Sequence, residues 1–131
     1  MAADGFQPGF RMSRIDAGVL IAGAIGAGWA SRIDGATAGA IVFVVAHFFL
    51  FCNVVRMSRS LELPWAGLFV ALAVATAQTG WPGWWPTFGS MTVVTIRMIA
   101  LQIRKPSYHG VFWRRINPEL RSWWERERSV R

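Results

Sequence analysis

Residues 36–55 read ATAGAIVFVVAHFFLFCNVV, twenty residues without a formal charge. At a rise of about 1.5 Å per residue, an α-helix of this length spans the roughly 30 Å hydrocarbon core of a bilayer. A long apolar run without charges is typical of a transmembrane helix. The stretch therefore predicts an all-α integral membrane protein.

Three shorter apolar segments accompany this run, at residues 15–31, 63–79 and 86–103. Each needs flanking residues to complete a crossing of the bilayer. Together the four segments predict a helical bundle over residues 15–104 with three or four transmembrane helices. In the three-span alternative, segment 15–31 lies in the interface or re-enters the membrane.

Positive charge is concentrated in bands between the apolar segments and after the last one. The chain has 14 basic and 7 acidic residues, a formal net charge of +7, and eight of the basic residues fall within 104–131. This banding is typical of a membrane protein with a basic aqueous face and disfavours nucleic-acid binding. Under the positive-inside rule it places the 1–14 arm and the 105–131 tail in the cytoplasm, with the bundle in a bacterial inner or intracytoplasmic membrane.

Small residues line one face of the first segment. Gly18, Ala22 and Gly26 lie four residues apart, and Gly39 stands near the start of the second segment. Small side chains let membrane helices approach closely, so that van der Waals packing drives their association. We expect the first two segments to form a tight helical hairpin through these residues.

Tryptophan gathers in the loop before the fourth segment and in the tail. Such residues commonly anchor a helical protein at the two membrane–water interfaces. A surface built to touch a partner is the alternative interpretation of the loop cluster. The predicted anchors are Trp81, Trp84, Trp85, Trp113, Trp123 and Trp124.

The tail contains the start signal of a helix. Asn117 is a good N-cap, and Pro118 suits the first helical position. We expect an amphipathic helix lying on the cytoplasmic leaflet, with its arginines attracting anionic lipids. Its apolar face consists of Leu120, Trp123 and Trp124.

His47 lies close to the middle of the 36–55 segment. Ionisable groups at that depth are costly, and they usually face a bundle interior, a cofactor or a partner. One interpretation is a hydrogen bond to a neighbouring helix, through Thr76, Gln78 or Thr95. The other is ligation of a metal centre, because a neutral imidazole can bind a metal through one ring nitrogen.

The stretch VVAHFFLF at residues 44–51 resembles the membrane helix of purple-bacterial light-harvesting polypeptides. In that family the matching histidine ligates the magnesium of bacteriochlorophyll. The resemblance thus implies that His47 binds bacteriochlorophyll. Haem is the alternative cofactor for this histidine, and carotenoid or lipid contacts are further possibilities for the protein. It covers about fifteen of the 131 residues. The family is single-span and carries a Trp-Arg-Pro-Trp-like stretch after the helix, where this chain has CNVVRMSR at residues 52–59.

Arg97 interrupts the fourth segment seven residues before Arg104, roughly 10 Å inside the interface. A central arginine costs about 2.5 kcal/mol or more, although a long side chain can snorkel part of the way outward. Glu62 and Asp16 are possible partners within the chain. Another subunit, a lipid phosphate or a cofactor carboxylate would serve equally.

The sequence lacks a Ser/His/Asp set, a phosphate-cradling glycine loop and a pair of membrane-embedded carboxylates. We therefore expect that this protein is not an enzyme. The leading prediction is a non-catalytic accessory or structural subunit of a larger membrane complex, either a photosynthetic reaction-centre and antenna assembly or a respiratory one. The alternatives are a cofactor-binding membrane protein that uses His47 and a small independent lipid-binding or carrier protein that uses Arg97.

Overall fold

The computed structural model describes residues 5–130, and these residues form helices and loops without a strand. This confirms the prediction of an all-α protein. The first four residues of the predicted arm and the last residue of the tail lie outside the described residues. The elements are α1 (Arg14–Ala30), α2 (Gly35–Phe49), a π-helical turn η1 (Leu50–Val54), α3 (Arg59–Thr79), α4 (Trp84–Ile103), α5 (Trp113–Ile116) and α6 (Leu120–Ser129).

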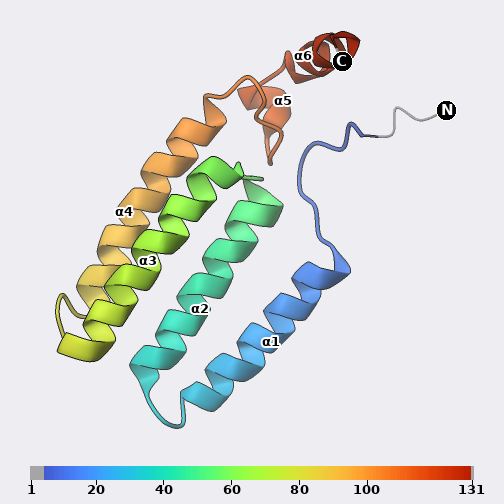
Figure 1. Cartoon of the computed structure of the whole chain (residues 1–131). Coiled ribbons are helices and arrows are strands. Elements are labelled where there is room, and N and C mark those ends of the chain that lie inside the picture. The colour runs from blue at the N-terminus through green and yellow to red at the C-terminus, as the bar shows by residue number, and fades with distance from the viewer. Residues whose placement is uncertain (1–4, 131) are drawn as a thin grey trace.

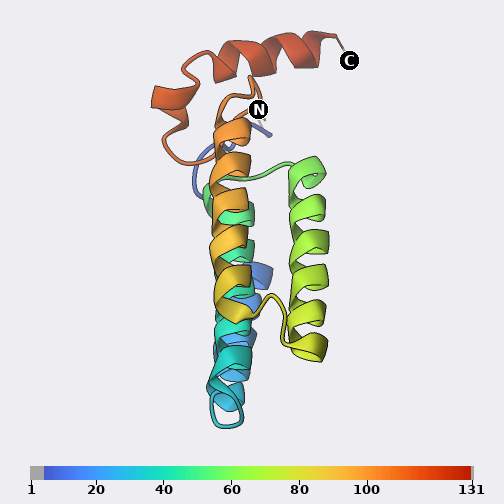
Figure 2. The same cartoon turned by 90° about the vertical axis from the view of Figure 1, so that its left-hand side faces the viewer.

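The four long helices run alternately up and down (Figure 1). Seen from the side, α1, α2 and α4 stand nearly behind one another, whereas α3 stands apart from that row (Figure 2). The main contacts join α1 to α2, α3 to α4, and α2 to α4. As a result α1 is the outermost helix and packs chiefly on α2. The N-terminal segment, α5 and α6 all lie at one end of the bundle (Figure 1).

Side chains at the N-termini of α1 and α2 fix where these helices begin. Ser13 Oγ accepts from the Asp16 N–H at 3.1 Å, and Asp16 Oδ2 accepts from the Ser13 N–H at 2.6 Å, a capping box. At α2 the Asp34 carboxylate accepts from the backbone of Ala36 and Thr37 and from the Thr37 hydroxyl. The Thr37 hydroxyl and these N–H groups hold the pKa of Asp34 below its usual range.

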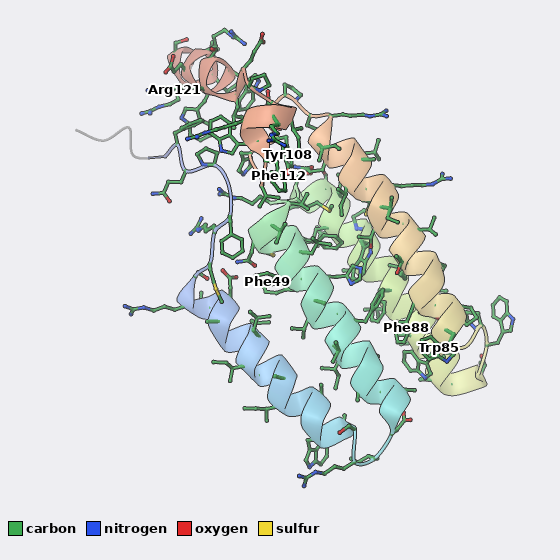
Figure 3. The ribbon with its side chains drawn as sticks, turned by 180° about the vertical axis from the view of Figure 1, so that it is seen from behind. Phe49, Trp85, Phe88, Tyr108, Phe112 and Arg121 are labelled. Carbon is green, nitrogen blue, oxygen red and sulfur yellow. The ribbon has the colours of Figure 1, made fainter. Side chains whose placement is uncertain are left out.

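A small aromatic core lies where α2, η1, α3 and α4 meet. It consists of Phe51, Trp65, Phe69 and Met91, all buried. Phe88 of α4, labelled in Figure 3, reaches the edge of this core. The remaining apolar side chains of the bundle largely face outward. Large exposed ones include Ile21, Ile25, Val42, Val70, Val93, Ile96 and Leu101.

Buried hydrogen bonds join α3 to α4. The Trp65 indole donates from Nε1 to Thr95 Oγ1 at 2.8 Å. Further along the two helices, the hydroxyls of Thr76 and Thr87 lie 3.2 Å apart. A buried polar group without a partner would cost free energy because it has lost its contact with water. These hydrogen bonds therefore offset that cost and set the register of the two helices.

The predicted hairpin of the first two segments exists, but a different glycine makes its close contact. A Cβ added at Gly23 would lie 2.6 Å from Val45 Cγ2, so α1 and α2 approach most closely there. Nothing lies within 4 Å of the corresponding position at Gly18 or Gly26, and Ala22 is exposed. The expectation that the Gly18, Ala22 and Gly26 face packs on α2 is thereby corrected: the contact face is rotated around the helix.

Gly39 also has a partner other than the one predicted. A Cβ at this position would meet the ring of Phe88 at 3.8 Å, an ordinary van der Waals contact. Gly39 therefore faces α4 rather than α1. Its small size lets α2 and α4 come together. The contact of α2 with α4 is less extensive than its contact with α1.

The segment before α5 docks on the end of η1. Tyr108 is buried, and burial raises its pKa; its hydroxyl donates to the Val111 carbonyl at 2.9 Å. The Val111 N–H donates to the Val54 carbonyl at 2.9 Å, and the N–H of Gly9 donates to the His109 carbonyl at 2.7 Å. The tail and the N-terminal arm are thus tied to each other and to the bundle. Tyr108 and Phe112 mark this junction in Figure 3.

Helix α6 is amphipathic as predicted, but its apolar face packs on the protein. Leu120 is buried, and the ring of Trp124 lies 5.9 Å from the ring of Phe6 in the arm. The arm thus covers part of this face, and Trp123 and Trp124 stay partly exposed. The position of α6 on a lipid leaflet stays a prediction. Asn117 is not the N-cap either. Its side chain donates to the carbonyls of Pro106 and Tyr108, and α6 begins at Leu120.

Two stretches of the described chain are helical, long and apolar enough to cross a membrane: Gly35–Val54, which joins α2 to η1, and α3. Only a small share of either stretch is buried inside the molecule. An apolar helix that is left largely uncovered by its own chain needs another apolar surface around it.

Candidate functional site

His47 lies in an aromatic cluster formed by α2, η1 and α3. Its ring centre is 4.1 Å from that of Phe43 and 4.9 Å from that of Trp65, with the Trp65 plane nearly parallel. Phe51 meets the ring edge-on at 5.8 Å. The residue is half-buried, with the rings of Phe43 and Trp65 against the imidazole.

The hydrogen bond of His47 fixes its tautomer. Nδ1 lies 2.7 Å from the Phe43 carbonyl oxygen one turn earlier. A carbonyl oxygen can only accept a hydrogen bond, so Nδ1 must carry the hydrogen. In the neutral ring Nε2 then carries the lone pair. Across residues 5–130, Asn53 Oδ1 and Trp124 Nε1 are the enclosed side-chain atoms without a hydrogen bond. His47 Nε2 is not among them, and no hydrogen bond to it is formed, so this atom is not fully enclosed.

The neighbouring-helix partners expected for His47 are engaged elsewhere. Thr95 accepts from Trp65, Thr76 pairs with Thr87, and Gln78 is exposed. The expectation of an interhelical hydrogen bond from His47 is corrected, because the imidazole bonds within its own helix.

A metal at His47 would have a single protein ligand. Within the part of the chain that the structure describes, no group of three His, Cys, Asp or Glu side chains could hold a metal ion. A single axial imidazole, oriented by a hydrogen bond from its other nitrogen to a backbone carbonyl, suits the metal of a tetrapyrrole. The donor set thus fits magnesium of bacteriochlorophyll or iron of haem, and it does not fit a bare cation site.

Arg97 forms a salt bridge with neither of the acidic residues considered as its partners. It is exposed on α4. Glu62 instead lies 3.9 Å from Arg59, and Asp16 accepts from the Asn53 amide at 2.9 Å. The expected pairing of Arg97 with Glu62 or Asp16 is therefore not formed, and its guanidinium faces the surroundings of the bundle.

The two groups of tryptophans have different environments. Trp81 and Trp85 are 75% and 85% exposed at the loop between α3 and α4, with Trp84 half-buried beside them. Figure 3 shows Trp85 projecting from this end. In the tail, Trp113 packs edge-on against Phe6 at 5.8 Å. Trp113 and Trp124 contact Phe6 of the arm, and Trp123 lines a pocket between the tail and the arm. The role of all six tryptophans as interface anchors stays a prediction.

Asn53 is a functional candidate that sequence reasoning did not single out. It is 1% exposed in the π-helical turn η1. Its amide donates to the Arg11 carbonyl at 2.5 Å and to Asp16 Oδ2 at 2.9 Å, so it joins the arm, α1 and η1. The sequence feature that could have indicated it is a single amide side chain near the end of the apolar segment 36–55. π-Helical turns are often found at functional sites.

Comparison of this chain with protein-family models, with curated proteins and with solved structures finds no match.

Proposed function

We propose that this protein is an integral membrane protein with four transmembrane helices and that it serves as a non-catalytic accessory subunit of a larger membrane complex. The observation that carries the proposal is the outward direction of its apolar side chains. The most apolar helices, Gly35–Val54 and α3, bury little of themselves inside the molecule. Lipid or another protein would remove that surface from water.

The arrangement of the helices supports four crossings. Helices α1 to α4 alternate in direction, so the arm and the tail lie at the same end (Figure 1). That end also carries most of the basic residues, as the positive-inside rule requires of a cytoplasmic face. The exposed Trp81 and Trp85 lie at the opposite end, where an aromatic belt would be expected.

The outer face of α1 supports a role in assembly. This helix packs chiefly on α2 and leaves a stripe of small and large apolar residues uncovered. Small residues beside bulky ones form a groove into which a second membrane helix can pack closely. The stripe consists of Gly18, Ile21, Ala22, Ile25 and Trp29.

Filling this groove should disrupt assembly without unfolding the protein. We expect the double variant Gly18→Leu/Ala22→Leu to lose the high-mass species that the wild-type chain forms on native electrophoresis of mildly solubilised membranes. Gly67→Leu is the matched control, because Gly67 is equally open but lies on α3. Both variants should keep wild-type helix content by circular dichroism. A wild-type chain that runs as a lone monomer, or an unaffected high-mass species in the double variant, would count against the proposal.

A second candidate function is favoured by the geometry of His47. Its Nδ1 is engaged by the Phe43 carbonyl, Nε2 is not fully enclosed, and the rings of Phe43 and Trp65 lie against the imidazole. These features support ligation of bacteriochlorophyll or haem, and the resemblance of residues 44–51 to light-harvesting polypeptides favours the first pigment. In that case the host would be a photosynthetic complex.

The pigment hypothesis predicts a spectral loss. Protein purified from its native membrane should show a near-infrared or Soret band that His47→Leu removes. Gln78→Leu, at an exposed position on α3, serves as the control and should keep the band. An identical spectrum in His47→Leu would reject ligation by this residue while leaving the structural role untouched.

A further inference from the structure

A polar pocket of about 180 Å³ lies where the arm, α1 and η1 meet. It is lined by Arg11 and Ser13 of the segment before α1, by Asp16, and by Cys52 and Arg56. Two arginines thus line one open pocket at the end of the bundle that carries the tail. The pocket is large enough for a polyatomic group rather than a single water.

Neither arginine forms a salt bridge with a carboxylate among the described residues. The ion pairs among residues 5–130 are Arg59 with Glu62 and Arg121 with Glu125. Asp16 lines the pocket but is engaged by its own hydrogen bonds, since Oδ2 accepts from the Ser13 N–H at 2.6 Å and from the Asn53 amide at 2.9 Å. The pocket therefore carries two positive charges against one hydrogen-bonded negative charge.

Arg56 is held in this position at a cost. Its φ of 53° is left-handed, a conformation that long side chains rarely adopt and that often marks a functional site. Partial burial, and then the neighbouring Arg11, lower the pKa of Arg56. The first cause means that its positive charge is less well solvated than usual, and the second is repulsion between two like charges. An anion between Arg56 and Arg11 would relieve the desolvation and the repulsion together.

We propose that the Arg11–Arg56 pocket binds a phosphate group. A guanidinium presents several N–H donors in a plane that matches two phosphate oxygens, and charge-assisted bonds of this kind are strong. One donor of Arg56, on Nη1, is used by the Gln7 carbonyl, which leaves the others for a ligand. The Ser13 hydroxyl is a further donor beside them.

The phosphate can belong to a phospholipid headgroup or be free in solution. The pocket lies between the start of α1 and the end of η1, at the depth where headgroups would be if the bundle crosses the membrane as proposed. A bound phosphate would connect the arm to η1 through Arg11 and Arg56, beside the Asn53 bonds that already join these segments. The binding chemistry itself depends on neither the host complex nor a pigment.

The test uses the full chain in phosphate-free maltoside detergent, with binding followed by thermal unfolding and native mass spectrometry. The probes are dioctanoyl-phosphatidylglycerol, dioctanoylglycerol of the same chain length, and inorganic phosphate at matched ionic strength. We expect saturable stabilisation by the phospholipid but not by the glycerol lipid. Arg11→Gln and Arg56→Gln should each raise the Kd about tenfold, the loss typical of a charged hydrogen bond.

Arg59→Gln is the matched control, because Arg59 is exposed and already paired, and its Kd should stay within about twofold of the wild-type value. If inorganic phosphate also stabilises the protein, the pocket is a site for free phosphate. If only the phospholipid does, the pocket is a headgroup site. Should Arg56→Gln fail to fold, Arg11→Gln at an exposed position decides the question. Absence of saturable binding, or equal Kd values for Arg11→Gln and Arg59→Gln, would overturn the proposal without affecting assembly through α1.

Discussion

Replacing Gly110 with alanine is expected to release the tail from the bundle. A Cβ at this position would lie 2.6 Å from the Val55 carbonyl oxygen, 2.8 Å from that of Val54 and 2.6 Å from the Tyr108 hydroxyl. Real Cβ atoms are essentially never found so close to another heavy atom, and backbone carbonyls cannot rotate away as a flexible side chain can. Relieving the overlap must move the tail segment, which would break the hydrogen bond from Val111 to Val54.

Hydrogen exchange read by mass spectrometry measures this release directly. A cost of about 1–3 kcal/mol for the overpacked position corresponds to roughly 5- to 150-fold faster exchange at Val111 if the segment opens locally. Gly28→Ala is the matched control, since nothing lies within 4 Å of a Cβ there, and its tail exchange should equal that of the wild type. Unchanged protection at Val111 in Gly110→Ala would contradict the docking described above.

Replacing Gly23 with alanine is expected to weaken the α1–α2 hairpin. Its Cβ would fall 2.6 Å and 3.0 Å from the two γ-methyl groups of Val45. A β-branched side chain in a helix has one strongly preferred rotamer, so Val45 cannot turn aside. The two helices must separate, with a loss of about 1–3 kcal/mol in the free energy of unfolding.

Gly18→Ala is the comparison for this prediction, because it lies on the same helix with open space around it. Alanine there should stabilise the helix by up to about 1 kcal/mol through its better helix propensity. Denaturant titration of both variants in detergent micelles, followed by circular dichroism, would measure the difference. The reverse order of stability would place the hairpin contact on the Gly18 face instead.

The positions of the long helices could be predicted from the sequence because they follow from local composition. Segment 36–55 corresponds to the helical stretch Gly35–Val54, and segment 15–31 to Arg14–Ala30. Segment 63–79 ends where α3 ends, but α3 begins four residues earlier, at Arg59. The polar residues of that first turn are typical of a loop, and Ser58 caps the helix without a side-chain hydrogen bond that a sequence pattern would reveal.

The faces of the helices could not be predicted, because they depend on what each neighbour presents. Gly18 and Gly23 are both small residues in the first segment, and only the position of Val45 decides which of them makes the close contact. The same holds for Trp124, whose partner Phe6 lies more than one hundred residues away in the chain. Sequence spacing gives the apolar stripe of a helix and leaves open whether lipid or protein covers it.

At the candidate sites the sequence indicated the unusual residues but not their partners. His47 and Arg97 were recognisable because ionisable groups are rare in apolar segments. The bond from His47 to Phe43 lies within one helix, and a long-range partner was the more natural expectation. The π-helical turn η1 places Asn53, and the left-handed backbone after it places Arg56. Neither backbone feature has a clear signature in the sequence.

The placement of the apolar helices in lipid is the premise of the proposed function, and alkaline carbonate extraction of membranes that contain the full chain tests it most directly. We expect the protein to remain in the membrane pellet at high pH and to be released only by detergent. Recovery in the supernatant as a monodisperse protein, stable without detergent, would contradict the account.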